Sequence, residues 1–252
     1  MAEEALYYRP ETMAELDEIL SKFDGKVNFL AGGNYNFANL DEYAPLVDLQ
    51  SLGLDQIISS GSTVEIGGLA TLQQIGEAFQ SWDALQEALS AEAGLNVRNS
   101  LSLSNFLRSA DGRSPLLCVL LALNPTVAWL PSTKSLALSD YLASRQNYSN
   151  ECISQLSLIL PKHLAYEAVA RTPKDRPLIC MAGALDASDN LRITCGGLQS
   201  LPPVLSLPKG SQQAFELVRQ AYKQSDDAWA SAVYRQDVSQ VLLSRLFLSL
   251  GI

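Results

Sequence analysis

The stretch VNFLAGGNYNF, from Val27 to Phe37, decides how the fold of the first half of the chain is read. Residues 27–30 are mostly apolar, which predicts a short buried strand, and Gly32-Gly33 follow at its end. Glycine has no Cβ, so it accepts positive φ and lets a ligand approach main-chain N–H groups. The pair is therefore either a plain turn or a concave nest of N–H groups for an anion. Because it does not match GxGxxG, we do not expect a Rossmann site.

A second polar segment, from Asn99 to Asp111, is the other candidate binding loop. Its hydroxyl, amide and carboxyl groups are those of Ser100, Ser102, Ser104, Asn105, Ser109 and Asp111. Such groups can hydrogen bond to a phosphate or a ribityl chain, and equally they can form a solvated turn. Arg98, just before this segment, is either an anion contact or a charge at a helix end.

Composition restricts the class of protein. The chain has 252 residues, of which 47% are apolar and 18% charged, and this balance is typical of a compact globular protein. A net charge of −9 argues against nucleic acid as a partner, because phosphates are neutralised by clustered Lys and Arg. The first residues have no signal-peptide pattern, and the apolar run Leu116–Leu123 is too short to cross a membrane. We therefore expect a cytoplasmic protein without a membrane partner.

The sequence offers no local set of residues for metal binding or nucleophilic catalysis. The only histidine, His163, follows Pro161-Lys162 at an expected exposed strand end. No two cysteines form a CxxC pair, so we expect buried free thiols at Cys118, Cys152, Cys180 and Cys195. We accordingly predict no metal ligands and no catalytic side chain, and we expect any chemistry to be carried by a bound cofactor or a partner subunit.

Helix and strand patterns occur in blocks, which predicts an α+β protein rather than a βαβ repeat. Thr12 with Glu15, and Thr71 with Gln74, have the spacing of capping boxes, so a helix is expected after each threonine. Residues 56–66 predict a β-hairpin.

The polar run from Ser144 to Glu151 is the predicted linker between domains at 1–146 and 151–252. Beyond it, four apolar runs predict strands and two helices end the chain. Residues 98–115 are expected to be rich in loops. The amphipathic last helix, near 227–250, is explained by core packing or by a subunit contact.

Taken together, segments along nearly the whole chain resemble the flavoprotein (medium) subunits of molybdenum hydroxylases, the xanthine dehydrogenase and carbon monoxide dehydrogenase family. YYRPETMAELDEIL is similar to the family's "Y-x-RP-x-(S/T)-xxEA" opening, and FLAGGNYNF lies where the family has its "AGGT-D-L" loop. Further similar segments follow in the family's order: LVDLQSL, VEIGGLATLQQI, the VRN of 97–99, SPLLCVLLALNPTV, ARTPKDRPLICMAGAL, LRITCGGLQSLPP and SAVYRQDVSQVLLSRL.

This resemblance implies a two-lobed FAD-binding domain, of the vanillyl-alcohol-oxidase/PCMH-like type, followed by a C-terminal α+β domain of antiparallel sheet and helices. It implies an oxidoreductase subunit in which FAD passes electrons from iron–sulfur clusters to NAD or another acceptor. The implied partners are an iron–sulfur subunit and a molybdopterin subunit, with a homodimer considered for the isolated chain. The implied cofactor contacts are Leu30, Ala31, Gly32, Gly33, Asn34, Tyr35, Asn36, Ser102, Ser104, Asn105 and Asp111.

The second loop departs from the family pattern "RN-x-A-T-I-G-G-N", because this chain has RNSLSLSNF. Ser104-Asn105 replace the Gly-Gly pair, or one glycine is deleted and Asn105 matches the final Asn. A Cβ then stands where the backbone approaches the cofactor closely. The alternative interpretation is therefore a non-catalytic scaffold subunit that has lost FAD or binds another nucleotide-like ligand.

Overall fold

The computed structural model describes residues 6–31, 44–132, 134–148, 151–173 and 175–252. The chain divides into two compact units, each built from several segments. Unit 1 comprises Met1–Ile75, Leu95–Ser109 and Thr126–Leu158, and unit 2 comprises Gly76–Gly94, Ala110–Pro125 and Ile159–Ile252. The sequence-based domain boundary, with domains at 1–146 and 151–252, stays a prediction.

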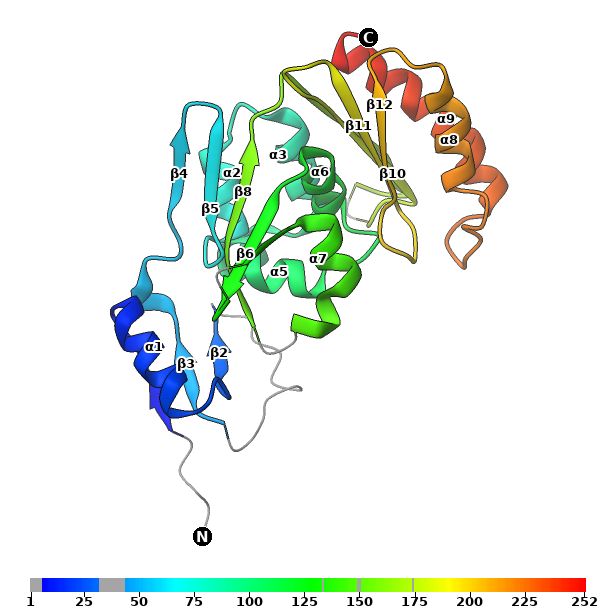
Figure 1. Cartoon of the computed structure of the whole chain (residues 1–252). Coiled ribbons are helices and arrows are strands. Elements are labelled where there is room, and N and C mark those ends of the chain that lie inside the picture. Colours follow the sequence, from blue (N-terminus) through cyan, green and yellow to red (C-terminus); the bar gives the residue numbers. More distant parts are fainter. Residues whose placement is uncertain (1–5, 32–43, 133, 149–150, 174) are drawn as a thin grey trace. The chain divides into compact units, whose positions relative to one another are not determined.

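Unit 1 begins with a small parallel sheet and one helix. The strand order is β1 (Tyr7–Tyr8), β3 (Leu46–Asp48), β2 (Asn28–Leu30), and α1 (Met13–Lys22) packs against this sheet through a shared apolar core (Figure 1). The predicted cap is confirmed, because the Glu15 N–H donates to Thr12 Oγ1 at 3.2 Å. This sheet sets the position from which the glycine loop leaves β2.

A five-stranded sheet forms the rest of unit 1. Its order is β4 (Ile57–Ser60), β5 (Thr63–Gly67), β8 (Cys152–Ile159), β6 (Thr126–Leu130), β7 (Ser135–Ala137). Strands β4 and β5 form the predicted hairpin. The helical segments belonging to unit 1, wholly or in part, are η2 (Gln50–Leu52), α2 (Leu72–Ala78), α4 (Leu95–Ser100), α5 (Leu103–Ser109), α7 (Leu138–Ser144) and η3 (Arg145–Tyr148).

One sequence-based expectation is wrong in unit 1. Much of the passage expected to be loop is helical, in α4 and α5, because its serines end one helix and cap the next. Within the predicted linker, Ser144 belongs to α7 and η3 follows directly, while its role as a link between domains stays a prediction. Short polar side chains are common both in loops and at helix ends, so composition alone did not separate the two.

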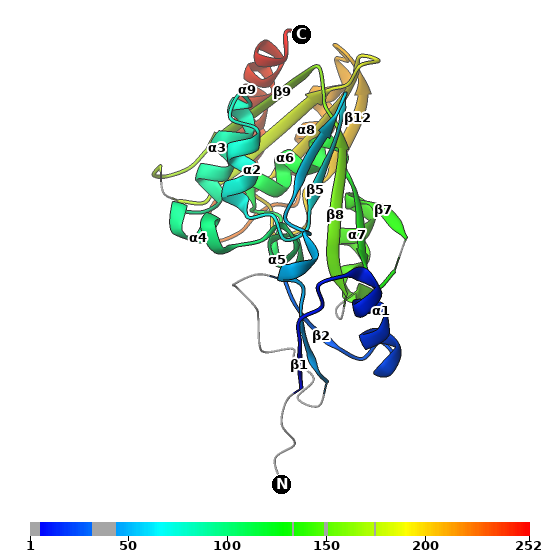
Figure 2. The ribbon, with the colours of Figure 1, turned by 90° about the vertical axis from the view of Figure 1, so that its left-hand side faces the viewer.

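Unit 2 is a three-layer arrangement around an antiparallel sheet. The strand order is β12 (Val204–Pro208), β11 (Asn190–Gly196), β10 (Ile179–Leu185), β9 (His163–Val169). Its helices are α3 (Asp83–Glu92), α6 (Pro115–Leu123), α8 (Gln213–Ala221) and α9 (Ala232–Leu250). Figures 1 and 2 show α8 and α9 on one face of the sheet, with α3 and α6 on the other. Every residue of β10 is consequently buried.

Alternation along β10 and β11 divides their side chains between the two helical layers. A Cβ on Gly183 would lie 2.9 Å from side-chain carbons of Leu246 and Leu250, on the α9 side. A Cβ on Gly196 would lie 2.6 Å from the sulfur of Cys180 and 3.3 Å from that of Cys118, on the α6 side. All four cysteines are buried and free, which confirms the prediction of buried thiols.

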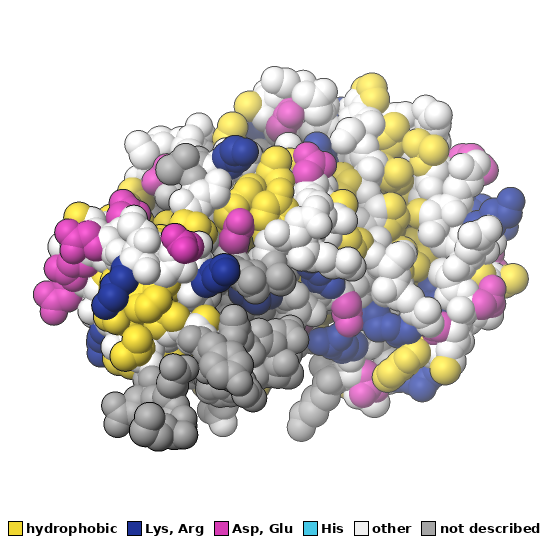
Figure 3. Space-filling model, turned by 60° about the horizontal axis from the view of Figure 1, so that its bottom comes forward, with side chains coloured by type: hydrophobic (Ala, Val, Ile, Leu, Met, Phe, Trp, Pro, Cys, Tyr) yellow, Lys and Arg dark blue, Asp and Glu magenta, His cyan; other side chains and the backbone are white. Residues whose placement is uncertain are grey.

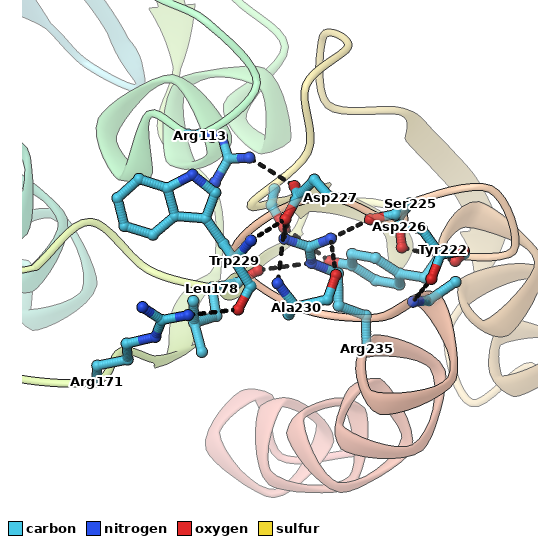
Figure 4. A network of polar contacts seen from close by, with 12 residues as sticks. Arg113, Arg171, Leu178, Tyr222, Ser225, Asp226, Asp227, Trp229, Ala230 and Arg235 are labelled. Carbon is cyan, nitrogen blue, oxygen red and sulfur yellow. Dashed lines mark hydrogen bonds and ion pairs between the residues drawn. The ribbon is translucent and has the colours of Figure 1, made fainter.

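A buried ion-pair network fixes the start of α9, as Figure 4 shows. The Arg235 guanidinium is fully buried and donates from Nη2 to Asp227 at 2.9 and 3.1 Å, and from Nε to the Leu178 carbonyl at 2.9 Å. Arg113 donates to the same carboxylate at 2.5 Å and lies over the ring of Trp229. Burial alone would raise the pKa of Asp227, but backbone N–H groups and Arg235 outweigh it and lower that pKa.

Candidate functional site

The two candidate loops meet at the carbonyl oxygen of Ala31, directly after β2. Ser102 Oγ donates to this oxygen at 2.6 Å, and Asn105 Nδ2 donates to it at 3.2 Å. Ala31 is 4% exposed and Ser102 is 1% exposed, so water competes little for these hydrogen bonds. We call this arrangement the loop contact. It joins residues more than 70 positions apart, and the glycine pair follows immediately beyond it.

The backbone N–H groups of the first residues of α5 donate hydrogen bonds to other atoms of unit 1. The Leu103 N–H donates to the Ala70 carbonyl, and the Ser104 N–H donates to the Gly68 carbonyl, both at 2.8 Å. The Asn105 N–H donates to Ser102 Oγ at 3.3 Å, which makes this serine the cap of the helix. These three N–H groups are therefore engaged by the protein and are not available to a ligand.

Ser104 points into the core of unit 1. Its side chain is fully buried, its Oγ accepts from the Ile153 N–H at 3.2 Å, and its Oγ lies 3.4 Å from the sulfur of Cys152. Burial raises the pKa of the Cys152 thiol to about 11, so this neighbour is uncharged at neutral pH. The Ser104 side chain therefore faces the interior of unit 1.

Two residues not singled out as functional in the sequence analysis support the loop contact. A Cβ on Gly68 would lie 1.8 Å from the Ile153 carbonyl oxygen, so only glycine fits between α5 and β8. Asp48, 7% exposed at the end of β3, pairs in register with Leu30 and accepts a 2.7 Å hydrogen bond from Tyr7. That hydrogen bond raises the pKa of Tyr7. The segment VEIGGLATL contained the first signal, because two adjacent glycines end a strand there.

Asp111 belongs to unit 2, whereas the other described candidates belong to unit 1. Its carboxylate accepts from Arg176 Nη1 at 3.2 and 3.4 Å and from the Arg113 N–H at 2.9 Å. Arg176 also lies 3.9 Å from the buried carboxylate of Glu92. Burial raises the pKa of Glu92, although it accepts hydrogen bonds from Ser114 Oγ and the Leu116 N–H.

The structure thus brings together Ala31, Ser102 and Asn105, turns Ser104 inward and places Leu30 at the end of β2. The predicted contacts Gly32, Gly33, Asn34, Tyr35 and Asn36 lie outside the described residues.

Several wider features of the described residues limit what the site can be. Among them, no group of three His, Cys, Asp or Glu side chains is placed to hold a metal ion. No helix in the described ranges is long and apolar enough to span a bilayer. Figure 3 shows one face on which Lys and Arg side chains lie in small groups among acidic and apolar ones.

A model of the family described as the FAD binding domain in molybdopterin dehydrogenase matches residues 2–161. The resemblance stated from the sequence is thereby confirmed. A comparison with curated protein sequences gives no match.

Solved structures match the whole chain. A chain of reconstituted CO dehydrogenase from Oligotropha carboxidovorans is 18% identical with a TM-score of 0.72, covering 99% of this chain and 98% of that chain. A chain of quinoline 2-oxidoreductase from Pseudomonas putida 86 is 17% identical with a TM-score of 0.70, covering 100% and 98%. A chain of the Hydrogenophaga pseudoflava carbon monoxide dehydrogenase that lacks the Mo-pyranopterin moiety is 16% identical with a TM-score of 0.69, again covering 100% and 98%. These likenesses confirm the predicted fold class.

Proposed function

This chain belongs to the family of FAD-binding domains in molybdopterin dehydrogenases, a family of oxidoreductases, and we propose that it is the electron-transfer subunit that holds FAD in such an enzyme. The loop contact is the observation that carries the proposal. Ser102 and Asn105 both bond to the Ala31 carbonyl, so the second loop fixes the point from which the glycine loop departs. Holding Ala31 in place before a ligand binds lowers the entropy cost of binding at this position.

The residues from Leu30 to Asn36 would surround the FAD pyrophosphate with backbone N–H groups. The first loop carries this role because the first three N–H groups of α5 are already engaged. Ser102 and Asn105 are proposed as positioning residues, and the Asn105 amide is proposed to contact the cofactor as well. Ser104 supports the loop from inside the core, and Asp111 is proposed to bind hydroxyl groups of the cofactor.

The chemistry of FAD is the reversible uptake and release of electrons, and the protein contributes binding, orientation and exclusion of water. We propose that electrons reach the flavin from iron–sulfur clusters on a small subunit, which drain a molybdopterin subunit. Bound FAD would supply the redox chemistry that passes these electrons to NAD or another acceptor. The chain itself needs no acid–base pair for this role, and we place the assembly in the cytoplasm.

Thermal melting tests cofactor choice. A ligand that binds only the folded chain adds about 2.7 kcal/mol of stability at 100 times its Kd. FAD is expected to raise Tm clearly, whereas FMN, which lacks the pyrophosphate and the adenosine half of FAD, should raise it much less. Equal shifts from both flavins would contradict the assigned role of the glycine loop.

One observation favours a second candidate, a scaffold subunit without flavin. The backbone N–H groups of the first three residues of α5 already donate to acceptors within the protein, so a ligand cannot use them. On this alternative, FAD leaves Tm unchanged, while an iron–sulfur or molybdopterin subunit raises it.

A further inference from the structure

Helix α9 presents a stripe of three apolar side chains, Tyr234, Val241 and Leu248, to solvent. Its inner side carries Leu242, Leu246 and Leu250, which are fully buried. On its outer side, Val241 is 52% exposed and Leu248 is 78% exposed. The outer side of a surface helix is normally polar, so this stripe marks a contact surface.

The stripe follows a heptad spacing. Tyr234, Val241 and Leu248 are each seven residues apart, and Asp237 and Ser244 lie between them on the same exposed side. The three apolar residues occupy one of the two heptad positions along which a second helix packs, and polar Asp237 and Ser244 occupy the other. The seam from Tyr234 to Leu248 is about 21 Å long at 1.5 Å per residue.

We propose that α9 packs antiparallel against α9 of a second copy of this chain, around a two-fold axis at Val241. In such a pair the residue four places before Val241 faces the residue four places after it. Asp237 then faces Arg245 of the second copy, and Tyr234 faces Leu248. The surface is therefore complementary to itself in charge as well as in apolar character, as a two-fold interface requires.

The charges within one chain leave both ionic groups available. Arg219 lies 3.9 Å from Asp237, but their side chains are 54% and 69% exposed, so this pair contributes little. Glu167 on β9 is close enough to Arg245 to sense its charge, and Arg245 is itself exposed. One helix per copy gives an interface at the lower end of stable assemblies, so we expect a dimer with a micromolar Kd.

Sedimentation velocity of the full chain over a range of concentrations tests this proposal. Asp237→Arg and Arg245→Asp each place like charges at both symmetric contacts, and each is expected to raise the dimer Kd roughly tenfold. The double variant restores opposite charges and should return the Kd to the wild-type range. Val241→Lys should abolish association. Its matched control is Ile58→Lys, which changes an aliphatic side chain of equal exposure, 51%, on β4.

Two results would overturn the proposal. The first is a wild-type chain that stays monomeric to millimolar concentration. The second is a dimer whose Kd is not restored by the double variant, because another surface, or a different subunit covering α9, would then explain the stripe. Circular dichroism melts of every variant verify that the exposed substitutions leave the fold intact.

Discussion

Replacing Ser102 with alanine removes two interactions of one buried hydroxyl. The substitution deletes the 2.6 Å hydrogen bond to the Ala31 carbonyl, a net loss of about 1 kcal/mol. It also deletes the cap that accepts from the Asn105 N–H, a loss of about 1 kcal/mol. Because one oxygen atom is lost from a site only 1% exposed, little cavity forms. Unfolding of unit 1 should become easier by about 2 kcal/mol.

Urea denaturation followed by circular dichroism measures this change as a lower midpoint with an unchanged m value. Ser100→Ala is the matched control. Ser100 is exposed and its Oγ donates only to carbonyls of its own helix, at 3.2 and 3.3 Å, so we expect a change within about 0.5 kcal/mol. If both alanine variants lose the same free energy, or if Ser102→Ala loses less than about 0.5 kcal/mol, the loop contact does not stabilise unit 1.

A double-mutant cycle separates the shared carbonyl from other effects. Ser102 and Asn105 donate to the same oxygen atom, so the energies of their alanine substitutions should couple by about 1 kcal/mol. Additive energies would contradict this geometry. Under the proposed function, Ser102→Ala also weakens FAD binding, whereas Ser100→Ala does not.

Three further predictions concern other parts of the fold. Gly68→Ala should lower the free energy of unfolding by about 3 kcal/mol or more, because its Cβ would lie 1.8 Å from the Ile153 carbonyl oxygen. Gly94→Ala, whose Cβ would have nothing within 4 Å, should be tolerated, and thermal melts that show equal losses for the two variants would refute this prediction. Asp227→Asn should lower the free energy of unfolding, measured by urea denaturation, by about 3–5 kcal/mol, since it leaves the buried Arg235 charge without its counterion. The exposed control Asp17→Asn should leave the free energy of unfolding almost unchanged. Burial raises the pKa of Glu92 above its ordinary value of 4.5, so the unfolded chain loses this proton at a lower pH than the folded chain does. The free energy of unfolding should therefore fall as pH rises from 4.5 through the raised pKa. Glu92→Gln should reduce this dependence of the free energy of unfolding on pH, and an unchanged slope would refute the prediction.

Local signals in the sequence were sufficient to predict helices and strands wherever neighbouring residues determine the structure. The capping box at Thr71 forms as predicted, and Thr12 caps its helix, although the Glu15 carboxylate accepts from the Glu11 N–H rather than from that of Thr12. Apolar runs also located the strands of unit 2, apart from β12, an edge strand whose prolines obscured the pattern.

The candidate site depended on information that no local pattern carries. The bond between Ser102 and Ala31 joins positions 71 apart, and only the packing of β2 beside α5 creates it. The inward direction of Ser104 follows from its contact with β8, so sequence alone left open whether its side chain blocks a cofactor. In the same way, the partner of Asp111 is Arg176, which lies 65 residues away.

The visible absorbance spectrum of the purified chain, after incubation with FAD and removal of unbound flavin by gel filtration, tests the central claim most directly. Our account predicts one FAD retained per chain, with a flavin band displaced from that of free FAD. A protein peak without flavin absorbance, from a chain shown by circular dichroism to be folded, would contradict the claim that this subunit holds FAD.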